Sequence, residues 1–251
     1  MDLAPLGPLR PRLEADRQLL ILDLDHGKAN EIGAAQLDAF EALCAALEVD
    51  PAITCLCTTS TRRSASGKPI FIAGANVTER VGWDDDRIKA HVLRQRRLMQ
   101  RLRRLPLFTI ALSHGVTLGW GAEFILTADY AIATEEATFG LPETGLGILP
   151  GARGTAELAL LLGPAHALRL GCTGEVIDGR EAARVGLVQE VVPDHAAGIE
   201  RVRALADLLR RLQARRPRRP RPARGGPAGD RAPRLRALRR RRRGGDRPGR
   251  L

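Results

Sequence analysis

The segments FGLPETGLGILPGARGT (residues 139–155) and TLGWGAEF (residues 117–124) decide how this chain is interpreted. Each contains one glutamate, Glu143 in the longer segment and Glu123 in the shorter, and glycines flank both. A third glycine-containing turn, FIAGAN, covers residues 71–76. Because glycine lets the backbone approach a ligand closely, the three segments predict main-chain amides that face two carboxyl groups. That combination suits acid–base chemistry beside a carbonyl on which negative charge develops.

The regions around these segments alternate between strand and helix patterns. Apolar residues recur at three- and four-residue spacing in residues 34–48, which predicts a helix. We expect strands at residues 19–24, 53–59, 70–73, 107–112, 130–133 and 138–140, and helices at residues 34–48, 86–105, 121–128, 155–162 and 199–212. The order strand, strand, helix recurs about three times between residues 53 and 163, which predicts an α/β fold whose successive turns stack on one another.

Positive charge is concentrated toward the C-terminal end of the sequence. The chain has 40 Lys and Arg residues against 29 Asp and Glu, a net charge of +11. From Arg210 onward there are 18 Arg against Asp230 and Asp246, so this segment carries +16 and the rest of the chain carries −5. Residues 215–251 are rich in Arg, Pro and Gly and poor in core-forming residues, which predicts disorder. Two hypotheses for this tail remain open: a polyanion-binding arm, nucleic acid included, and an out-of-frame translation of a GC-rich gene.

Cysteine and histidine positions give no metal-binding pattern. The four cysteines, Cys44, Cys55, Cys57 and Cys172, form no C-x-x-C pair, and the five histidines lack metal-ligand spacing. We therefore expect no metal, and reduced thiols typical of a cytosol-like compartment. No apolar run approaches the ~20 residues needed to cross a bilayer, and the first residues lack the features of a signal peptide. These observations predict a soluble, cytoplasmic protein.

Five ordered motifs resemble those of the enoyl-CoA hydratase/isomerase (crotonase) superfamily. They are GKANEI (residues 27–32), FIAGAN (71–76), HGVTLGWGAE (114–123), FGLPETGLGILPGARGT (139–155) and TGEVIDGREAARVGLVQEVVP (173–193). Taken alone, each glutamate is typical of a helix cap and each glycine of a turn. Their combination, in order and at matching spacing, favours the functional interpretation.

The resemblance implies a crotonase-like spiral of repeated ββα units. Residues 1–198 would form the acyl-CoA-binding catalytic body, and residues 199–214 would start the C-terminal helical region. Because the Arg-rich residues 215–251 stand where further helices are expected, this region would be truncated or aberrant. The resemblance also implies a homotrimer or hexamer, if the C-terminal region permits it, and a place in fatty acid metabolism.

The resemblance assigns catalysis to Glu123 and Glu143, and an oxyanion hole to the main-chain N–H groups of Ala75 and Trp120. The residues alone do not separate the two glutamate roles; the resemblance favours Glu123 on the water and Glu143 as proton donor to the α carbon. Further substrate-binding positions are implied at Lys28, Ala29, Ala73, Gly74, Gly119 and Gly121. Coenzyme A would enter only as part of the substrate, with no separate cofactor.

Three departures from the superfamily pattern affect the expected site. Asn76 stands in place of an aspartate and can cap a helix equally well. Trp120 replaces a glycine, and we expect its indole near the acyl site or a subunit contact. Arg153 also replaces a glycine and would either place a cation near the pocket or point to solvent. Candidates for contacts with coenzyme A phosphates, or for a solvated loop, are Lys28, Arg62, Arg63 and Lys68.

The sequence therefore predicts an enoyl-CoA hydratase that adds water to a 2-enoyl-CoA thioester. An acyl-CoA isomerase or a CoA-thioester hydrolase of the same superfamily is the nearest alternative, because one oxyanion pocket can serve several reactions. A polyanion-binding protein that uses its Arg-rich tail is an alternative from another class. A third is an inactive superfamily member, given Trp120, Arg153 and the altered C-terminal region.

Overall fold

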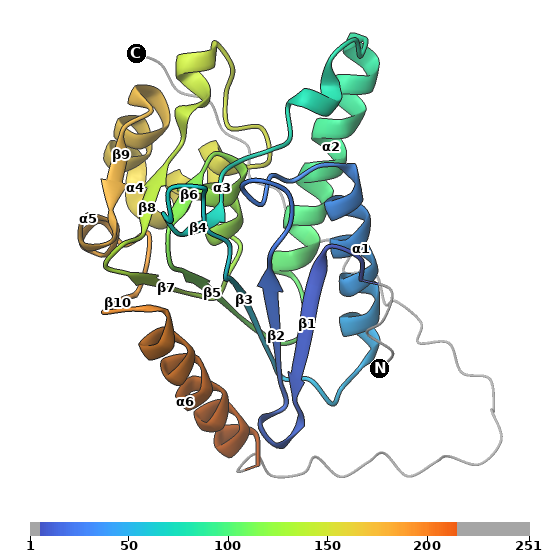
Figure 1. Cartoon of the computed structure of the whole chain (residues 1–251), viewed down its shortest axis with the longest axis vertical. Helices are drawn as coiled ribbons and strands as arrows, with labels where there is room; N and C mark the ends of the chain where they lie inside the picture. The colour runs from blue at the N-terminus through green and yellow to red at the C-terminus, as the bar shows by residue number, and fades with distance from the viewer. Residues whose placement is uncertain (1–5, 215–251) are drawn as a thin grey trace, which may run out of the picture. The chain divides into compact units, whose positions relative to one another are not determined.

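The computed structural model describes residues 6–214, and within them the strands form two sheets (Figure 1). The larger sheet contains, in spatial order, β1 (Leu9–Glu14), β2 (Leu19–Leu24), β3 (Cys55–Ser60), β5 (Phe108–Ser113), β7 (Tyr130–Thr134) and β10 (Glu190–Val192). The smaller sheet contains β4 (Ile70–Ile72), β6 (Val116–Leu118), β8 (Thr138–Gly140) and β9 (Val176–Asp178). Antiparallel pairing occurs between β1 and β2 and between β8 and β9; the other pairs are parallel.

The predicted recurrence of strand, strand and helix is confirmed. Each turn of the chain adds one strand to the larger sheet, one to the smaller sheet, and then a helix: β3–β4–α2, β5–β6–α3 and β7–β8–α4. The described helices are α1 (Ala34–Val49), α2 (Asp85–Arg103), α3 (Trp120–Ile125), α4 (Gly154–Thr173), α5 (Gly179–Val185) and α6 (His195–Ala214), with short 3₁₀ turns η1 (Ala15–Arg17), η2 (Thr78–Arg80) and η3 (Pro142–Leu146). The glycine segments thus lie at equivalent places in successive turns of one spiral.

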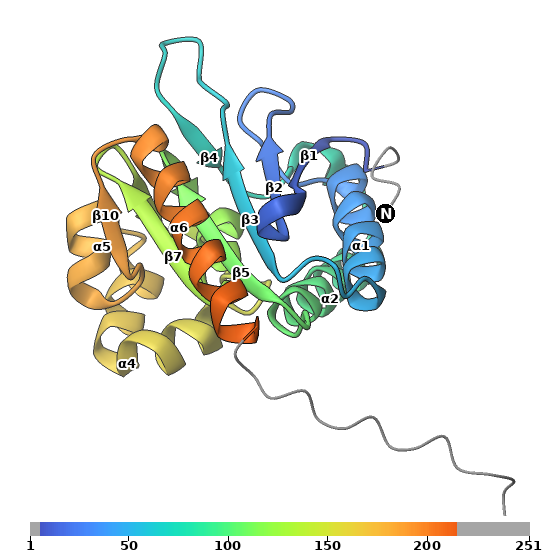
Figure 2. The same ribbon diagram turned by 90° about the horizontal axis from the view of Figure 1, so that it is seen from below.

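Both faces of the larger sheet are buried at β2, which explains why this strand is apolar at nearly every position. On β2, Leu20, Leu22 and Leu24 belong to the core shared with α1 and α2, whereas Leu19 and Ile21 belong to a second core under α6. Alternate side chains of a strand point to opposite faces, so two covering layers require a continuous apolar run. Figure 2 shows α6 (orange) running along its face of this sheet.

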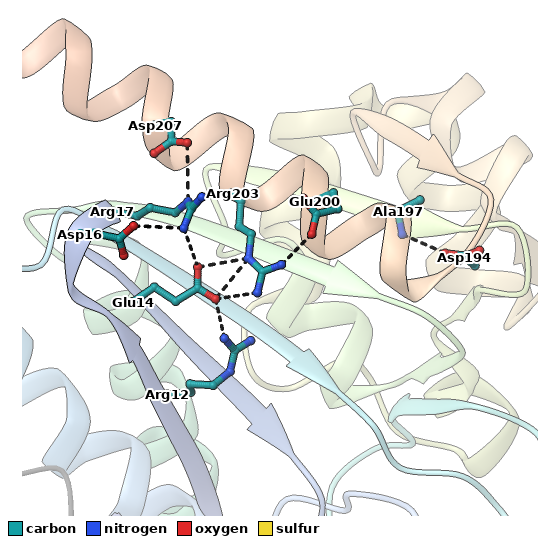
Figure 3. Close-up of polar contacts among 9 residues, drawn as sticks. All are labelled: Arg12, Glu14, Asp16, Arg17, Asp194, Ala197, Glu200, Arg203 and Asp207. Atoms are coloured by element: carbon teal, nitrogen blue, oxygen red, sulfur yellow. Dashed lines mark hydrogen bonds and ion pairs between the residues drawn. The ribbon is translucent and has the colours of Figure 1, made fainter.

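The helix expected at residues 199–212 exists as α6 and is tied to the first hairpin (Figure 3). Arg203 donates to both carboxylate oxygens of Glu14, at 2.8 and 3.1 Å, and Arg17 lies 3.5 Å from Asp207. The hydrogen bond from Arg203 is the main reason that the pKa of Glu14 is lowered. The apolar side of α6 covers the second core, and the ion pairs with the β1–β2 hairpin hold the helix in its orientation on the sheet.

Several elements differ from the sequence-based expectations. The strands β1, β6 and β9 were not expected. In β1 (LRPRLE) charged residues and a proline interrupt the apolar pattern, as an edge strand allows. The helix expected at residues 155–162 continues to Thr173 across a break at Gly163, where φ is 76° and ψ is 164°. Glycine tolerates this conformation, and Pro164 follows directly.

The tail, residues 215–251, lies outside the described residues, so its predicted disorder and both hypotheses about it stay predictions. Among residues 6–214, no helix is long and apolar enough to cross a membrane. Cys55 and Cys57 are buried on one face of β3 as expected, whereas Cys172 is exposed.

Candidate active site

Glu123 lies in the first turn of α3 and is buried, with 4% of its surface exposed. Its Oε1 accepts a hydrogen bond of 2.6 Å from the main-chain N–H of Gly154. A Cβ at residue 154 would lie 2.8 Å from Glu123 Cγ, so the close approach requires glycine. Burial raises the pKa of Glu123 to about 7; the Gly154 hydrogen bond acts in the opposite direction, and the charge of Glu143 raises the pKa further.

Glu143 lies in η3 and is half-buried. Its Oε1 is 3.0 Å from the position that a Cβ on Gly119 would occupy, so this carboxyl group faces the Gly119 turn. Its Oε2 is buried and has no hydrogen-bond partner among residues 6–214. Burial raises the pKa of Glu143. A buried carboxyl oxygen without a partner is costly unless a ligand completes it.

The two glycine turns predicted to form an oxyanion hole face each other. The Cβ position of Gly119 is 3.9 Å from Gly74 Cα, and both glycines have positive φ, 52° and 133°. Within the part of the chain that the structure describes, the N–H groups of Ala75 and Trp120 have no acceptor, although adjacent amides do: Gly119 N–H donates to Gly140 O at 2.9 Å. Two unpaired amides beside a carboxyl group are suited to bind a developing oxyanion.

The turn at residues 26–32 is fastened to the Gly74 turn by Asn30. The buried Asn30 amide donates to Leu24 O, Ser60 Oγ and Phe71 O at 3.1, 2.8 and 2.9 Å. This arrangement explains why the positions predicted from separate motifs meet. Main-chain hydrogen bonds run from Ala73 N–H to Ala29 O (3.1 Å) and from Ile32 N–H to Gly74 O (3.0 Å). The structural role of Asn30 was signalled only by its place at the end of the GKAN turn.

The remaining predicted binding positions have different surroundings. Gly121 is buried, and a Cβ there would lie 2.3 Å from Ile72 O, so its close contact is with β4. Arg62 forms an ion pair with Asp25 at 3.2 Å and donates to Lys28 O at 3.3 Å, so its guanidinium already has partners within this chain. The other basic candidates, Lys28, Arg63 and Lys68, are exposed.

The Trp120 indole, expected near the acyl site or a subunit contact, lies in the core. The side chain is 2% exposed and packs in the core, with ring centroids 5.6 Å from Phe124 and 6.1 Å from Phe40 of α1. The ring therefore packs against Phe40 of α1 and Phe124 of α3. The indole Nε1 has no partner among residues 6–214.

Arg153 forms an ion pair within its own turn, and its side chain is 37% exposed. Its guanidinium donates to Glu157 Oε1 at 3.1 and 3.0 Å, and Glu157 is 3% exposed. Arg103 of α2 donates to the other oxygen of Glu157 at 2.6 Å. The Arg153 backbone has φ 102° and ψ 0°, a region that favours glycine. Arg153 is therefore a half-buried residue at a strained turn, and its ion-pair partner Glu157 is buried.

The chain is similar to known proteins over the region that contains these motifs. The family model described as enoyl-CoA hydratase/isomerase matches residues 20–215. The chain belongs to this family. Its two sheets and repeated ββα units are the crotonase fold: an enoyl-CoA hydratase from Bacillus anthracis superposes with a TM-score of 0.73 at 29% identity, over 81% of this chain and 77% of that one.

Two relatives from Bacillus subtilis are named as members of this family. YngF, named as an enoyl-CoA hydratase/isomerase, is 37% identical over 65% of this chain and 61% of its own length. A second, named as an enoyl-CoA hydratase, is 34% identical over 77% of this chain and 73% of its own length. The match thus spans about two thirds of each relative.

Some site residues of this family member were not predicted. Gly154, Glu157 and Arg96, whose Nε donates to Gly151 O at 2.8 Å, together shape the turn that holds Glu123. Gly154 was visible within the PGARG motif, but no sequence pattern links Arg96 or Glu157 to it. Among residues 6–214, no cluster of His, Cys, Asp or Glu could hold a metal ion.

Proposed function

We propose that this protein is an enoyl-CoA hydratase, which adds water reversibly to a 2-enoyl-CoA thioester. The thioester oxygen would accept hydrogen bonds from the N–H groups of Ala75 and Trp120. The water oxygen would bond to the β carbon as Glu123 accepts a water proton, and Glu143 would give a proton to the α carbon. A proton passing from Glu123 back to Glu143 completes the cycle.

The observation that carries this proposal is that two interacting carboxyl groups lie together and that one of them, Glu143, faces the turn before Trp120, whose N–H has no acceptor among residues 6–214. Burial raises both pKa values, and the charge of Glu143 raises that of Glu123 further. Raised pKa values bring carboxyl groups toward the pH at which they can act as acid and base.

Geometry supports the division of roles. The α carbon is bonded to the carbonyl carbon whose oxygen would lie between the two amides. Glu143 faces the Gly119 turn, which carries one of those amides, so it is suited to reach the α carbon. The Gly154 N–H fixes Oε1 of Glu123, and this carboxyl group is suited to direct water to the β carbon.

Loss of the enoyl-thioester absorbance of crotonyl-CoA tests the proposal. Replacing Glu123 or Glu143 by Gln keeps the shape but removes one acid–base group, and each variant should lose about 10²–10⁴-fold in kcat. Glu135→Gln, at an exposed ion pair with Arg180, is the matched control and should keep full activity.

Other products would contradict hydration. A shifted double bond would indicate an isomerase, and free coenzyme A thiol would indicate a hydrolase; chromatography of the products separates these outcomes from a 3-hydroxyacyl thioester.

The proposal includes assembly as a homotrimer or hexamer. Large apolar side chains are exposed on the segment from η3 to α4: Leu146, Ile148, Leu149, Leu160, Leu161 and Leu168. Contiguous exposed apolar residues commonly mark protein–protein contacts. Sedimentation of the full chain measures its mass directly.

A further inference from the structure

The turn that carries Arg153 is strained and is held by charged contacts. Three non-glycine residues among residues 6–214 have positive φ: Gln18 and Asn30, both at 53°, and Arg153 at 102°. The first two lie near the ordinary left-handed region, whereas Arg153 lies well beyond it. A non-glycine residue keeps such a conformation only where its surroundings impose it, and such residues cluster at functional sites.

The contacts that hold the Arg153 backbone in this conformation come from two helices, α4 and α2. Arg153 donates twice to Glu157, one turn along α4, while Arg103 at the end of α2 donates to the second Glu157 oxygen. Arg103 also donates to Leu126 O at 3.0 Å, directly after α3. The buried Glu157 carboxylate therefore joins the start of α4 to the end of α2, and Arg103 also contacts the residue after α3.

This cluster lies directly beside a catalytic contact. Gly154, the residue after Arg153, gives its N–H to Glu123 Oε1 at 2.6 Å. On the other side of the turn, Arg96 of α2 donates to Gly151 O at 2.8 Å. Residues 151–154 are thus fixed at both ends, and the direction of the Gly154 N–H depends on the Arg153 backbone.

We propose that Arg153 and Glu157 are positioning residues: with Arg103, they hold the strained turn that directs the Gly154 N–H at Glu123. The inference rests on the proposed hydratase function, in which Glu123 is the base. Without the ion pair, a non-glycine residue at 153 relaxes toward negative φ and the adjacent N–H turns away from the carboxylate. The ionised form of Glu123 then loses a donor, and its pKa rises.

Arg153→Gly and Arg153→Met are a matched pair, because both remove the cation but only methionine keeps the backbone strain. Carbon NMR of carboxyl-labelled Glu follows Glu123 directly, with its signal assigned by its absence in Glu123→Gln. The charged groups that face Glu123, Glu143 and Arg96, stay unchanged in both variants. We expect Arg153→Met to titrate about one pH unit above the wild type, as for the loss of one hydrogen bond.

Arg153→Gly should titrate with the wild type, because glycine adopts the turn without support. An unchanged titration in Arg153→Met, or an equal shift in both variants, would overturn the proposal. If Arg153→Met does not fold, Arg153→Lys replaces it, since lysine cannot make the two-nitrogen contact with Glu157. A shift in the same direction is expected there, and its absence would also overturn the proposal.

Kinetics add an independent measurement. Arg153→Met should lower kcat for hydration about 10- to 100-fold with KM unchanged, as for a displaced catalytic group. The control Arg180→Met, at an exposed ion pair, should leave both constants unchanged. A wild type that hydrates no enoyl thioester would contradict the proposed function alone, because the titrations test the positioning role without substrate.

Discussion

Glu123 and Glu143 occur in similar glycine-flanked segments, yet the fold gives them different surroundings. Glu123 is almost fully buried on a helix, and one of its oxygens is held by the Gly154 amide. Glu143 lies in a short 3₁₀ turn, is half-buried and has one oxygen without a partner among residues 6–214. The comparison shows how one residue type can have two surroundings: a glycine of the other segment approaches each carboxyl group, Gly154 for Glu123 and Gly119 for Glu143, and burial raises both pKa values.

The largest effect should come from filling the space beside Glu123. In Gly154→Ala the new methyl group would lie 2.8 Å from Glu123 Cγ and displace the carboxyl group. We expect kcat for hydration to fall about 100-fold, the scale of a 1 Å misplacement. Gly145→Ala, in the Glu143 segment, is the control, because a Cβ there meets nothing within 4 Å. Equal activities of the two variants would show that the Gly154 contact has no catalytic importance.

The next effect concerns stability. The folded-state pKa of Glu123, about 7, is above its ordinary value of 4.5, so the folded protein binds this proton more tightly than the unfolded chain. This contribution is present at low pH and is lost as the pH rises through 7. Above pH 7 the folded protein bears the cost of burying the ionised Glu123 carboxylate. Glu123→Gln removes this cost, and we expect it to raise the free energy of unfolding at pH 8 by about 1–3 kcal/mol.

Denaturant unfolding at pH 8 and pH 4 measures this gain, which should vanish at pH 4. Glu143→Gln, at the less buried site, should gain less at pH 8. A larger gain for Glu143→Gln would reverse the comparison between the two carboxyl groups.

The smallest effect tests the coupling between the two carboxyl groups. The negative charge of Glu143 is one of the causes that raise the pKa of Glu123, so Glu143→Gln should move the titration of Glu123 to lower pH. The carbon NMR titration described above detects the shift. A titration of Glu123 that does not respond to Glu143→Gln would mean that the two groups act independently.

Much of the fold was predictable because it depends on short-range patterns. The strand β2 and the strand β8 were placed at their observed bounds, and α1 and α2 to within two residues, because period and termination signals are local. The two glutamates and the glycine turns were predicted as a site for the same reason, since each motif is contiguous. The side chains around them were not predicted: the inward turn of Trp120 and the pairing of Arg153 with Glu157 depend on which helices meet.

The sequence by itself determined the alternation of strands and helices, the three glycine turns and the two glutamates that they carry. Only the tertiary structure decided that Glu143 faces the Gly119 turn, that Gly154 holds Glu123, and that α2 fixes the turn between them. The physical reason is distance along the chain. Periodicity and turn chemistry act between neighbours, whereas burial, unpaired amides and pKa shifts arise where segments that are far apart in the sequence pack together.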